Sequence, residues 1–527
     1  MKTRQLALAV LIVCLCSSMM VNAGYIGDSG TVMYHQKYGI YPVSYVVEPC
    51  NSTFYQSTNA SGYVNKSIDA SDIINAANTV THDNGGGIVM IRGGWYTATS
   101  SIVVPNGVTD VGEGINVTFL QAASTLHTAI VKIEGTNDGN LHYGGLRDCT
   151  LDGSLVVSGT GGEYGLHLYK SKRATFYNVY IHDTWDSGAF IEGTGTGDDE
   201  SVLNTFYSLF VINCGVGQDN VHSGSTVLPA GLEFTNWTPD NVFFNPNLGA
   251  NYRCGAYLYS SGNRYFGGGH IWGSVSHPGT YGIYFMVTAR DKVEGTEIEH
   301  MGRDGIRIYG GSYNSSNSGG AVITGCTING NSYAVAGSYD GIFLYADAVD
   351  CEDITIVGNR IWDRATEGSK TQRYGINFHE VYNATLGLGY IDNLILVGND
   401  FGDNTTTGSA SGPQTGYVNM NGTGNEVHHN SGFVLEATGY VTSCMNGTWV
   451  AHGVAISPNN FQLMMRGNEY VNSTAFFLPP TVITSNSTHF QISYYIFNVA
   501  TGIATVVAAA DSHTIYWTAE YLRIPGT

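Results

Sequence analysis

One short pattern of apolar and polar positions returns along the middle of the chain: a glycine, then an apolar, a variable, an apolar and a variable residue. It occurs eight times, with successive glycines 23 to 43 residues apart. The copies begin at Gly165, Gly188, Gly231, Gly255, Gly282, Gly305, Gly341 and Gly375. Alternation with a period of two predicts β-strands, because successive side chains of a strand point to opposite faces.

Between successive copies lies a second motif, an apolar residue that usually leads into Gly or Asn, as in the similar segments 266–272 and 356–362. These segments are too short and too rich in glycine for helix pairs, and a period of about 20 to 50 residues is typical of a solenoid. One coil cannot bury its own inner face, whereas stacked coils can. We therefore predict an all-β chain folded as a right-handed, single-stranded parallel β-helix.

The segments on either side of the repeat complete the predicted organisation. Lys2 and Arg4 precede an apolar run and a small-residue cleavage site at Ala23, which together are typical of a secretory signal. Ile73, Ile74, Ala77 and Val80 lie on one helical face behind an Asp/Ser cap, and predict a short helix that covers the open end of the coils. The last stretch holds alternating strands with turn signals, which predicts a β-sandwich. The expected domains are 1–23 signal peptide, 24–68 irregular extension, 69–432 β-helix and 433–527 sandwich.

Composition and charge narrow the function classes. The chain of 527 residues has 69 glycines, 35 tyrosines, only 12% charged residues and a net charge of −20. Nucleic acids and anionic membranes need basic patches, so neither is an expected partner. Twelve Asn-x-Ser/Thr sequons agree with an exported glycoprotein. Seven cysteines remain after the signal, an odd number, and we expect them to be buried in the coil interior rather than paired.

The segment from about 69 to 120 carries a resemblance to a known family. Its order is an acidic-capped short helix, Gly85-Gly-Gly87, a strand, a Gly-x-Tyr turn, a strand, Pro105-Asn-Gly-Val108 and Gly112-Glu-Gly114. This order resembles the first coils of the pectate-lyase-like superfamily of right-handed parallel β-helices, which includes pectate lyases, polygalacturonase-like hydrolases and phage tailspikes. The resemblance implies the fold and a polysaccharide as partner. The clustered aspartates and the Arg-x-Lys of its best-known enzymes have no counterpart here.

The variable positions of the Gly-led strands are expected to form two parallel rows on one outer face of the coils, about 4.8 Å apart from coil to coil. Aromatic platforms and hydrogen-bonding side chains together suit a glycan. The residues expected to bind it are His167, Tyr169, Phe190, Tyr257, Tyr259, Tyr284, Tyr309, Phe343, Tyr345 and Asn377. The alternative is that loops, the N-terminal extension or partner subunits cover this face and leave an ordinary buried layer.

Three residues of the same face are candidates for catalysis. Glu192 and Glu233 fall on successive coils, at a carboxyl separation of roughly 5 to 9 Å that spans the retaining and inverting arrangements of glycoside hydrolases. One would be the general acid and the other the base or nucleophile. Arg307, near Asp304, would neutralise an acidic sugar or act as a lyase base, or else form a surface ion pair. No cofactor and no metal ligand set are expected, although the loop 197–200 with its acidic triplet is one place for calcium.

Two functions remain open from the sequence. The first is a secreted polysaccharide hydrolase or lyase that acts on an extended glycan bound along the coil face. The alternative is a non-catalytic glycan-binding surface protein, such as an adhesin or a viral spike or tail-fibre-like protein. The segments 449–454, 486–492 and 515–521 are similar to small C-terminal domains of tail-fibre-like and carbohydrate-binding proteins, and a spike of this kind could form a homotrimer.

Overall fold

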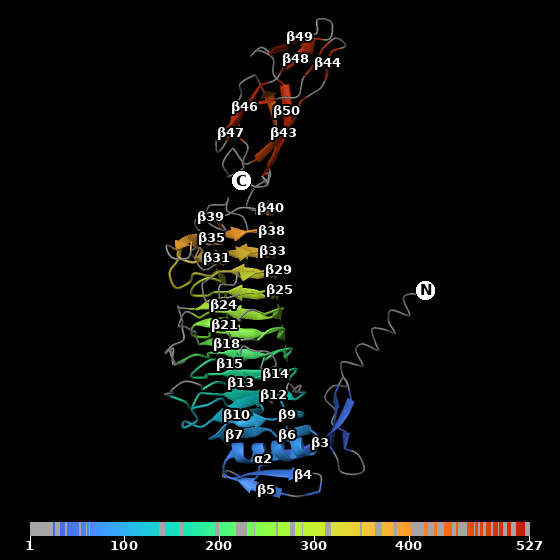
Figure 1. The fold of residues 1–527 in the computed structure, drawn as a ribbon, viewed down its shortest axis with the longest axis vertical. Coiled ribbons are helices and arrows are strands. Elements are labelled where there is room, and N and C mark those ends of the chain that lie inside the picture. The colour runs from blue at the N-terminus through green and yellow to red at the C-terminus, as the bar shows by residue number, and fades with distance from the viewer. Residues whose placement is uncertain are drawn as a thin grey trace, which may run out of the picture. The chain divides into compact units, whose positions relative to one another are not determined.

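The computed structural model describes residues 43–401 with short gaps, and gives strand backbone alone outside them (Figure 1). The gaps are 52–53, 60, 63, 136–142, 158–162, 195–199, 218–228, 237, 260–261, 275–279, 287, 311–317, 348–349, 364–370, 384–386 and 389. Residues 64, 347, 380–383 and 387–388 are described only as strand backbone. The chain forms two compact units, Met1–Met286 (unit 1) and Val287–Thr527 (unit 2). No helix among the described residues is long and apolar enough to cross a membrane.

Unit 1 begins with five strands that pair antiparallel in sequence order. They are β1 (Tyr25–Ile26), β2 (Val32–Gln36), β3 (Gly39–Pro49), β4 (Tyr55–Asn59) and β5 (Val64–Ser67). β3 also pairs in parallel with β6, the first strand of the coils, and so joins the hairpins to the solenoid. The segment 24–68, expected to be irregular, thus contains strands that have no counterpart in the repeat.

The predicted capping helix is confirmed as α2 (Ala70–Asp83), which lies across the first coil (Figure 1). The side chain of Asp69 accepts a hydrogen bond from the Ser71 amide at 2.9 Å and caps the helix. Ile73, Ile74 and Ala77 are buried against the coil, as predicted. Val80 is 40% exposed, so its predicted place on the apolar face is wrong.

The coils of unit 1 stack into three ladders of parallel strands. The first ladder is β6 (Gly87–Ile91), β9 (Val108–Val111), the first parts of β12 (Gly145–Asp152) and β14 (Thr175–His182), β16 (Thr205–Tyr207), β19 (Val242–Phe244) and β22 (Tyr265–Gly267). The second is β7 (Gly94–Ala98), β10 (Thr118–Ala122), the last parts of β12 and β14, β17 (Phe210–Ile212), β20 (Asn247–Gly249) and β23 (His270–Trp272). The third is β8 (Ile102–Val104), β11 (Val131–Glu134), β13 (Leu166–Tyr169), β15 (Ala189–Glu192), β18 (Ala230–Thr235), β21 (Cys254–Leu258) and β24 (Tyr281–Phe285).

The leading glycines of the repeat are required by close packing where each third-ladder strand begins. A Cβ atom on Gly165 would lie 2.2 Å from the Ile181 side chain, and one on Gly188 would lie 2.1 Å from that of Val211. Side chains of the coil interior therefore occupy the place that any other residue would need. The Gly-led pattern in the sequence reflects this contact, which recurs from coil to coil.

Stacks of identical or similar side chains fill the interior. Phe176, Phe206, Phe243 and Phe266 are fully buried, with ring centroids 4.5, 4.4 and 5.0 Å apart in succession. Buried asparagines bridge coils in the same way: the Asn204 amide donates to Asn241 at 3.0 Å. Five cysteines are buried and unpaired, as predicted: Cys149, Cys214, Cys254, Cys326 and Cys351. These columns satisfy polar groups and fill space without any disulfide among the described cysteines.

Unit 2 contains three ladders of parallel strands of its own. The first is β25 (Lys292–Glu294), β29 (Val322–Thr324), β33 (Thr355–Val357), β38 (Ile395–Val397) and β40 (Glu426–His428). The second is β26 (Glu297–Glu299), β30 (Thr327–Asn329) and β34 (Arg360–Trp362). The third is β27 (Ile306–Gly310), β31 (Ile342–Asp347), β35 (Tyr374–Asn383) and β39 (Gly416–Asn419), with β36 (Gly387–Leu388) antiparallel to β35. A small side ladder joins β28 (Ser318–Gly319), β32 (Cys351–Glu352) and β37 (Ile391–Asp392).

The C-terminal stretch of unit 2 consists of antiparallel strands. One group is β41 (Ala437–Cys444), β50 (His513–Tyr521) and β43 (Phe461–Gly467), and a second is β42 (Trp449–Ala451), β47 (His489–Ser493) and β46 (Thr481–Ser485). The third is β44 (Tyr470–Asn472), β45 (Ala475–Phe477), β48 (Tyr495–Asn498) and β49 (Ile503–Val506). The side chains here lie outside the described residues, so the sandwich and the domain boundary at 432 stay predictions.

Candidate active site

The outer face of the third ladder carries the predicted residues of unit 1 in register. His167 pairs with Phe190, Phe190 with Glu233, Glu233 with Tyr257 and Tyr257 with Tyr284, which forms the first row. Tyr169, Glu192 and Thr235 follow one another in the second row. The alternate side chains, such as Leu168 and Ile191, are fully buried inside the coils. The predicted register of the two rows is therefore confirmed within unit 1.

Much of the first row is nevertheless covered, so the expectation of an open wall is wrong there. Phe190 is buried in a cluster with Tyr164 and Ala129. Tyr257 is buried with Cys254 and Tyr281 among others. The partly buried side chains of Tyr259, Tyr284 and Met286 pack against that second cluster. The covering residues come largely from the chain just before the strand-leading glycines, and they turn this part of the face into the buried layer that the sequence left as the alternative.

One part of the face stays accessible, at β11, β13 and β15. His167 and Glu192 are hydrogen-bonded, with Nε2 and Oε2 3.1 Å apart, and their side chains are 16% and 29% exposed. The Lys132 ammonium lies 2.9 Å from the carboxylate of Glu134 on the same strand. It also lies 5.6 Å from the ring centre of Tyr169. An imidazole, carboxylates, an ammonium group and a phenol ring thus share one accessible patch.

A group of carboxylates surrounds Tyr164, next to this patch. The Tyr164 ring stacks on Phe190 at 4.6 Å and lies 5.6 Å from His167. Burial raises the pKa of the Tyr164 phenol well above its usual range. The negative charges of Glu233, Asp186, Glu192 and Glu163 raise this pKa further. Tyr164 therefore keeps its proton. Both predicted acids, Glu192 and Glu233, lie close enough to raise the pKa of this phenol.

The two predicted acids differ in access. Glu233 is fully buried and accepts a hydrogen bond from the Ser187 hydroxyl. The Ser187 hydroxyl oxygen in turn accepts from the Ala230 amide at 2.9 Å. The expectation that Glu233 points to solvent is wrong, because Ser187 and the preceding turn lie over it. Glu192 remains the accessible acid of the pair, and the catalytic roles of both stay predictions.

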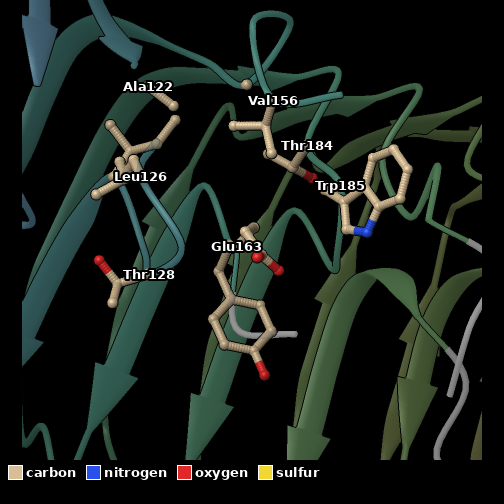
Figure 2. A pocket seen from close by; sticks show the side chains of 10 residues that line it. Ala122, Leu126, Thr128, Val156, Glu163, Thr184 and Trp185 are labelled. Atoms are coloured by element: carbon tan, nitrogen blue, oxygen red, sulfur yellow. The ribbon is translucent and has the colours of Figure 1, made fainter. Parts of the chain in front are cut away.

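A narrow recess borders this group where the second ladder turns into the third (Figure 2). Ala122, Leu126, Thr128, Val156, Glu163, Thr184 and Trp185 are among its lining residues. The buried Glu163 carboxylate lies 3.0 Å from His127 Nδ1. The recess is too narrow to admit a sugar ring, so a glycan would have to lie on the outer patch rather than enter here.

The predicted residues of unit 2 form a separate polar and aromatic cluster on its own third ladder. The Arg307 guanidinium lies 3.4 Å from the Asp304 carboxylate and 4.9 Å from the Phe343 ring centre. Tyr309 and Tyr345 stack with their centroids 5.3 Å apart. Burial raises the pKa of Asp304 to about 7. Arg307 thus contacts Asp304 as the sequence allowed, but the carboxylate is buried rather than at the surface. The catalytic role of Arg307 stays a prediction.

Asn377 lies in the same cluster of unit 2 but is buried, so its expected exposure is wrong. Its side-chain amide donates to Asp340 at 2.8 Å. Arg373 contacts the same carboxylate with two nitrogens, at 3.1 and 2.7 Å. Asp340 is thus fully buried and held by an arginine fork and an amide.

Six residues of the site were not predicted from the sequence. Tyr164, Glu163, Asp186 and Ser187 lie one or two positions before a strand-leading glycine, outside the template that began at that glycine. Lys132 and Glu134 lie in a coil whose third-ladder strand follows Ile130 rather than glycine. Extending each copy backwards by two residues, and accepting an apolar residue in place of the glycine, would have found all six.

Two places in the chain bear on metal binding. The loop 197–200 lies mostly outside the described residues, so calcium binding there stays a prediction. One group with metal-ligand character is present among the described side chains, formed by Asp152, His182 and Asp183 on the second ladder. It lies outside the patch described above.

Comparison with known proteins gives the fold. No protein-family model matches the sequence, and no curated protein matches it. Among solved structures, the A-module of mannuronan C-5 epimerase AlgE4 from Azotobacter vinelandii is similar, with a TM-score of 0.51, 17% identity, and coverage of 68% of this chain and 96% of that one. The enzymatically active domain of tailspike protein 2 from bacteriophage CBA120 has a TM-score of 0.48, 12% identity, and coverage of 95% and 88%.

The likeness to the AlgE4 module agrees with the ladders described above. The chain has the right-handed parallel β-helix fold, as the resemblance of its first coils implied. At such low identity the likeness concerns the fold alone. The chemistry has to be argued from the residues of the site.

Proposed function

We propose that this protein binds an extended glycan across the accessible patch of the third ladder in unit 1 and cleaves it there by acid–base chemistry. The observation that carries the proposal is the pairing of His167 with Glu192, an imidazole and a carboxylate that share a hydrogen bond on an accessible face. A carboxylate fixes the orientation and tautomer of the imidazole it contacts. Proton transfer by a side chain positioned in this way contributes about 10²–10⁴-fold to a rate.

Elimination suits the accessible groups better than hydrolysis by two carboxylates. Hydrolysis of that kind needs both acids beside the glycosidic bond, and Glu233 is fully buried. In elimination, His167 takes the proton from the ring carbon that bears the carboxylate of a uronic acid. The electron pair forms the new carbon–carbon double bond, the bond to the glycosidic oxygen breaks, and that oxygen takes a proton from water.

Lys132 and Tyr169 favour an acidic sugar as the ligand of this patch. Lys132 pairs in register with His167 on the next coil, so its ammonium group would offset the charge that develops on the sugar carboxylate. The ammonium groups of Lys132 and Lys170 lie 5.6 and 5.2 Å from the ring centre of Tyr169. A phenol ring flanked by two cations offers a C–H stacking face together with positive charge, although the whole chain is acidic.

A non-catalytic glycan-binding protein is the second candidate. The covered aromatic layer around Tyr257 favours it, because it leaves a polymer less of the face among the described residues of unit 1. A binder needs the patch but no proton transfer. Binding without any released product therefore distinguishes the two candidates.

The test is incubation with a panel of neutral and acidic polysaccharides. Products are measured as reducing ends, and as the ultraviolet absorbance of unsaturated uronic acids, which only elimination produces. Glu192→Gln and His167→Asn should each lose turnover while they still bind the polymer. Glu297→Gln, an exposed glutamate on the second ladder of unit 2, serves as the matched control and should keep it.

We also propose that the protein acts outside the cell. The signal-like segment 1–23 and the twelve sequons support export. N-terminal sequencing of secreted material, expected to begin after Ala23, tests this proposal. Assembly as a homotrimer stays a prediction, and sedimentation of the purified chain checks it.

A further inference from the structure

We propose that Asp152, His182 and Asp183 of unit 1 form a binding site for a divalent transition-metal ion of the zinc type. Asp152 and His182 are in register on successive coils of the second ladder, and Asp183 follows His182 directly. One ligand atom from each residue lies within 4.8 Å of the other two. A mixed set of one imidazole nitrogen and two carboxylate oxygens brings together ligand types that zinc accepts.

The distances within the group fit a small ion. His182 Nδ1 lies 2.8 Å from Asp183 Oδ2 and 3.7 Å from Asp152 Oδ1. Ligand atoms bonded to zinc at about 2.0–2.1 Å in a tetrahedron lie roughly 3.3 Å apart, between these two values. Binding then needs only small side-chain movements, with the proton of the imidazole on Nε2 and the lone pair of Nδ1 on the metal. The fourth position is left to water.

Charge also favours a cation at this place. Two carboxylates approach one another here, and the side chain of Asp152 is only 3% exposed. Within the described residues, the ion pairs of Asp152 and Asp183 involve His182 and no lysine or arginine. One protonated imidazole offsets one of the two negative charges, whereas a divalent ion offsets both.

Amide side chains on the coils before and after the group support its two carboxylates. The Gln121 amide donates to Asp152 Oδ2 at 2.8 Å, and the Asn213 amide donates to Asp183 Oδ1. Outer partners of this kind orient metal ligands. Calcium fits less well, since it takes six to eight oxygen ligands and no imidazole nitrogen. The exposed fractions of His182 and Asp183, 18% and 35%, leave a path from solvent.

The site has a structural consequence for the candidate active site. Gly153 and Thr184, the next residues after Asp152 and Asp183, line the recess together with Glu163 and Tyr164. An ion that joins Asp152 to Asp183 would tie together the starts of two successive turns. These turns lead to Tyr164 in one coil and to Ser187 in the next. The proposal predicts that metal stabilises this part of unit 1, whether or not the protein cleaves a glycan.

The experiment uses the full secreted chain, dialysed against a chelator and titrated with zinc chloride at neutral pH. Calorimetry should show one tightly bound zinc ion per chain, and elemental analysis should give the same stoichiometry. The temperature of thermal unfolding should rise when zinc is added. His182→Gln and Asp183→Asn should each weaken binding at least about tenfold and abolish the thermal shift. Asp148→Asn is the matched control. Asp148 accepts from Asn178 at 2.9 Å and has a left-handed backbone like that of Asp183, but it does not belong to the group of three ligand residues.

Three results would overturn the proposal. One is a wild-type chain that takes up no zinc. Another is a pair of ligand variants that bind zinc as tightly as the control does. The third is calcium that competes with zinc at equal concentration, since this would remove the role of the imidazole. None of these readouts depends on a glycan.

Discussion

The sharpest stability prediction concerns Asp110, a carboxylate inside the first coils of unit 1. Asp110 lies on β9 and is fully buried beneath α2. The Asn78 amide donates to its Oδ2 at 3.1 Å, and Oδ1 has no hydrogen-bond partner among the described residues. Burial raises the pKa of Asp110 from 3.8 to about 7, against the opposing effect of the Asn78 hydrogen bond. Below about pH 7 the folded protein therefore holds this side chain in its protonated form.

The sign and size of the pH effect follow from this pKa. Because the folded pKa is above the unfolded one, the stability contributed by the protonated group is fully present below pH 3.8 and is lost as the pH rises through about 7. A shift of roughly three units at about 1.4 kcal/mol each sets an upper limit of ~4 kcal/mol. Asp110→Asn keeps the shape and the neutral state at every pH. The variant should raise the free energy of unfolding by up to ~4 kcal/mol at pH 8 and by less than ~1 kcal/mol at pH 4.

The assay is denaturant unfolding of the wild type and of Asp110→Asn at both pH values, followed by tryptophan fluorescence. If unfolding proves irreversible, unfolding rates replace free energies. Asp353→Asn, an exposed aspartate of unit 2, is the control and should show no pH-dependent difference from wild type. An Asp110→Asn variant that is equally destabilised at both pH values would refute the burial of an ionisable group at this position.

Three further predictions test the patch and the packing of the coils. Tyr169→Ala should weaken glycan binding about fivefold in an affinity titration, because it removes one aromatic platform worth ~1 kcal/mol. Tyr177 is an exposed tyrosine of the first ladder, and Tyr177→Ala should leave binding unchanged. Gly188→Ala should lower the free energy of unfolding by about 1–3 kcal/mol, because the added Cβ meets Val211 at 2.1 Å; a neutral effect would contradict the packing reason for the Gly-led repeat. Asn359→Ala should cost about 1–3 kcal/mol by breaking the buried amide ladder of unit 2 at a 2.9 Å hydrogen bond, and a loss below ~0.5 kcal/mol would argue against that ladder.

The fold could be predicted from the sequence because its constraints recur in every coil. Gly188 has to be glycine because a Cβ atom there would collide with Val211. The same kind of contact recurs from coil to coil, so the glycine recurs in the sequence. The capping helix could be predicted from its own cap and apolar face. The N-terminal hairpins could not, since their strands pair with one another rather than with a repeat. Val80 was placed wrongly because the helical face that meets the coil is narrower than the apolar pattern.

The candidate site could be predicted only in part. The sequence placed His167 and Glu192 on one face, in neighbouring rows, and the structure confirms this shared face. The hydrogen bond between the two side chains was not predicted. Burial could not be predicted, because it depends on turns that the strand pattern does not describe. Ser187 in such a turn covers Glu233, and Tyr164 in another covers Phe190. A period-two pattern separates inside from outside, but it does not show which outside positions a turn then covers.

The decisive measurement is of products released from polysaccharides by the wild type and by Glu192→Gln. We expect the wild type to shorten at least one acidic polysaccharide with a gain in ultraviolet absorbance. We expect Glu192→Gln to bind the same polymer but to release products at least about 10²-fold more slowly. Cleavage that continues unchanged in Glu192→Gln would contradict the assigned site. A wild type that neither binds nor shortens any polymer of the panel would contradict the glycan role itself.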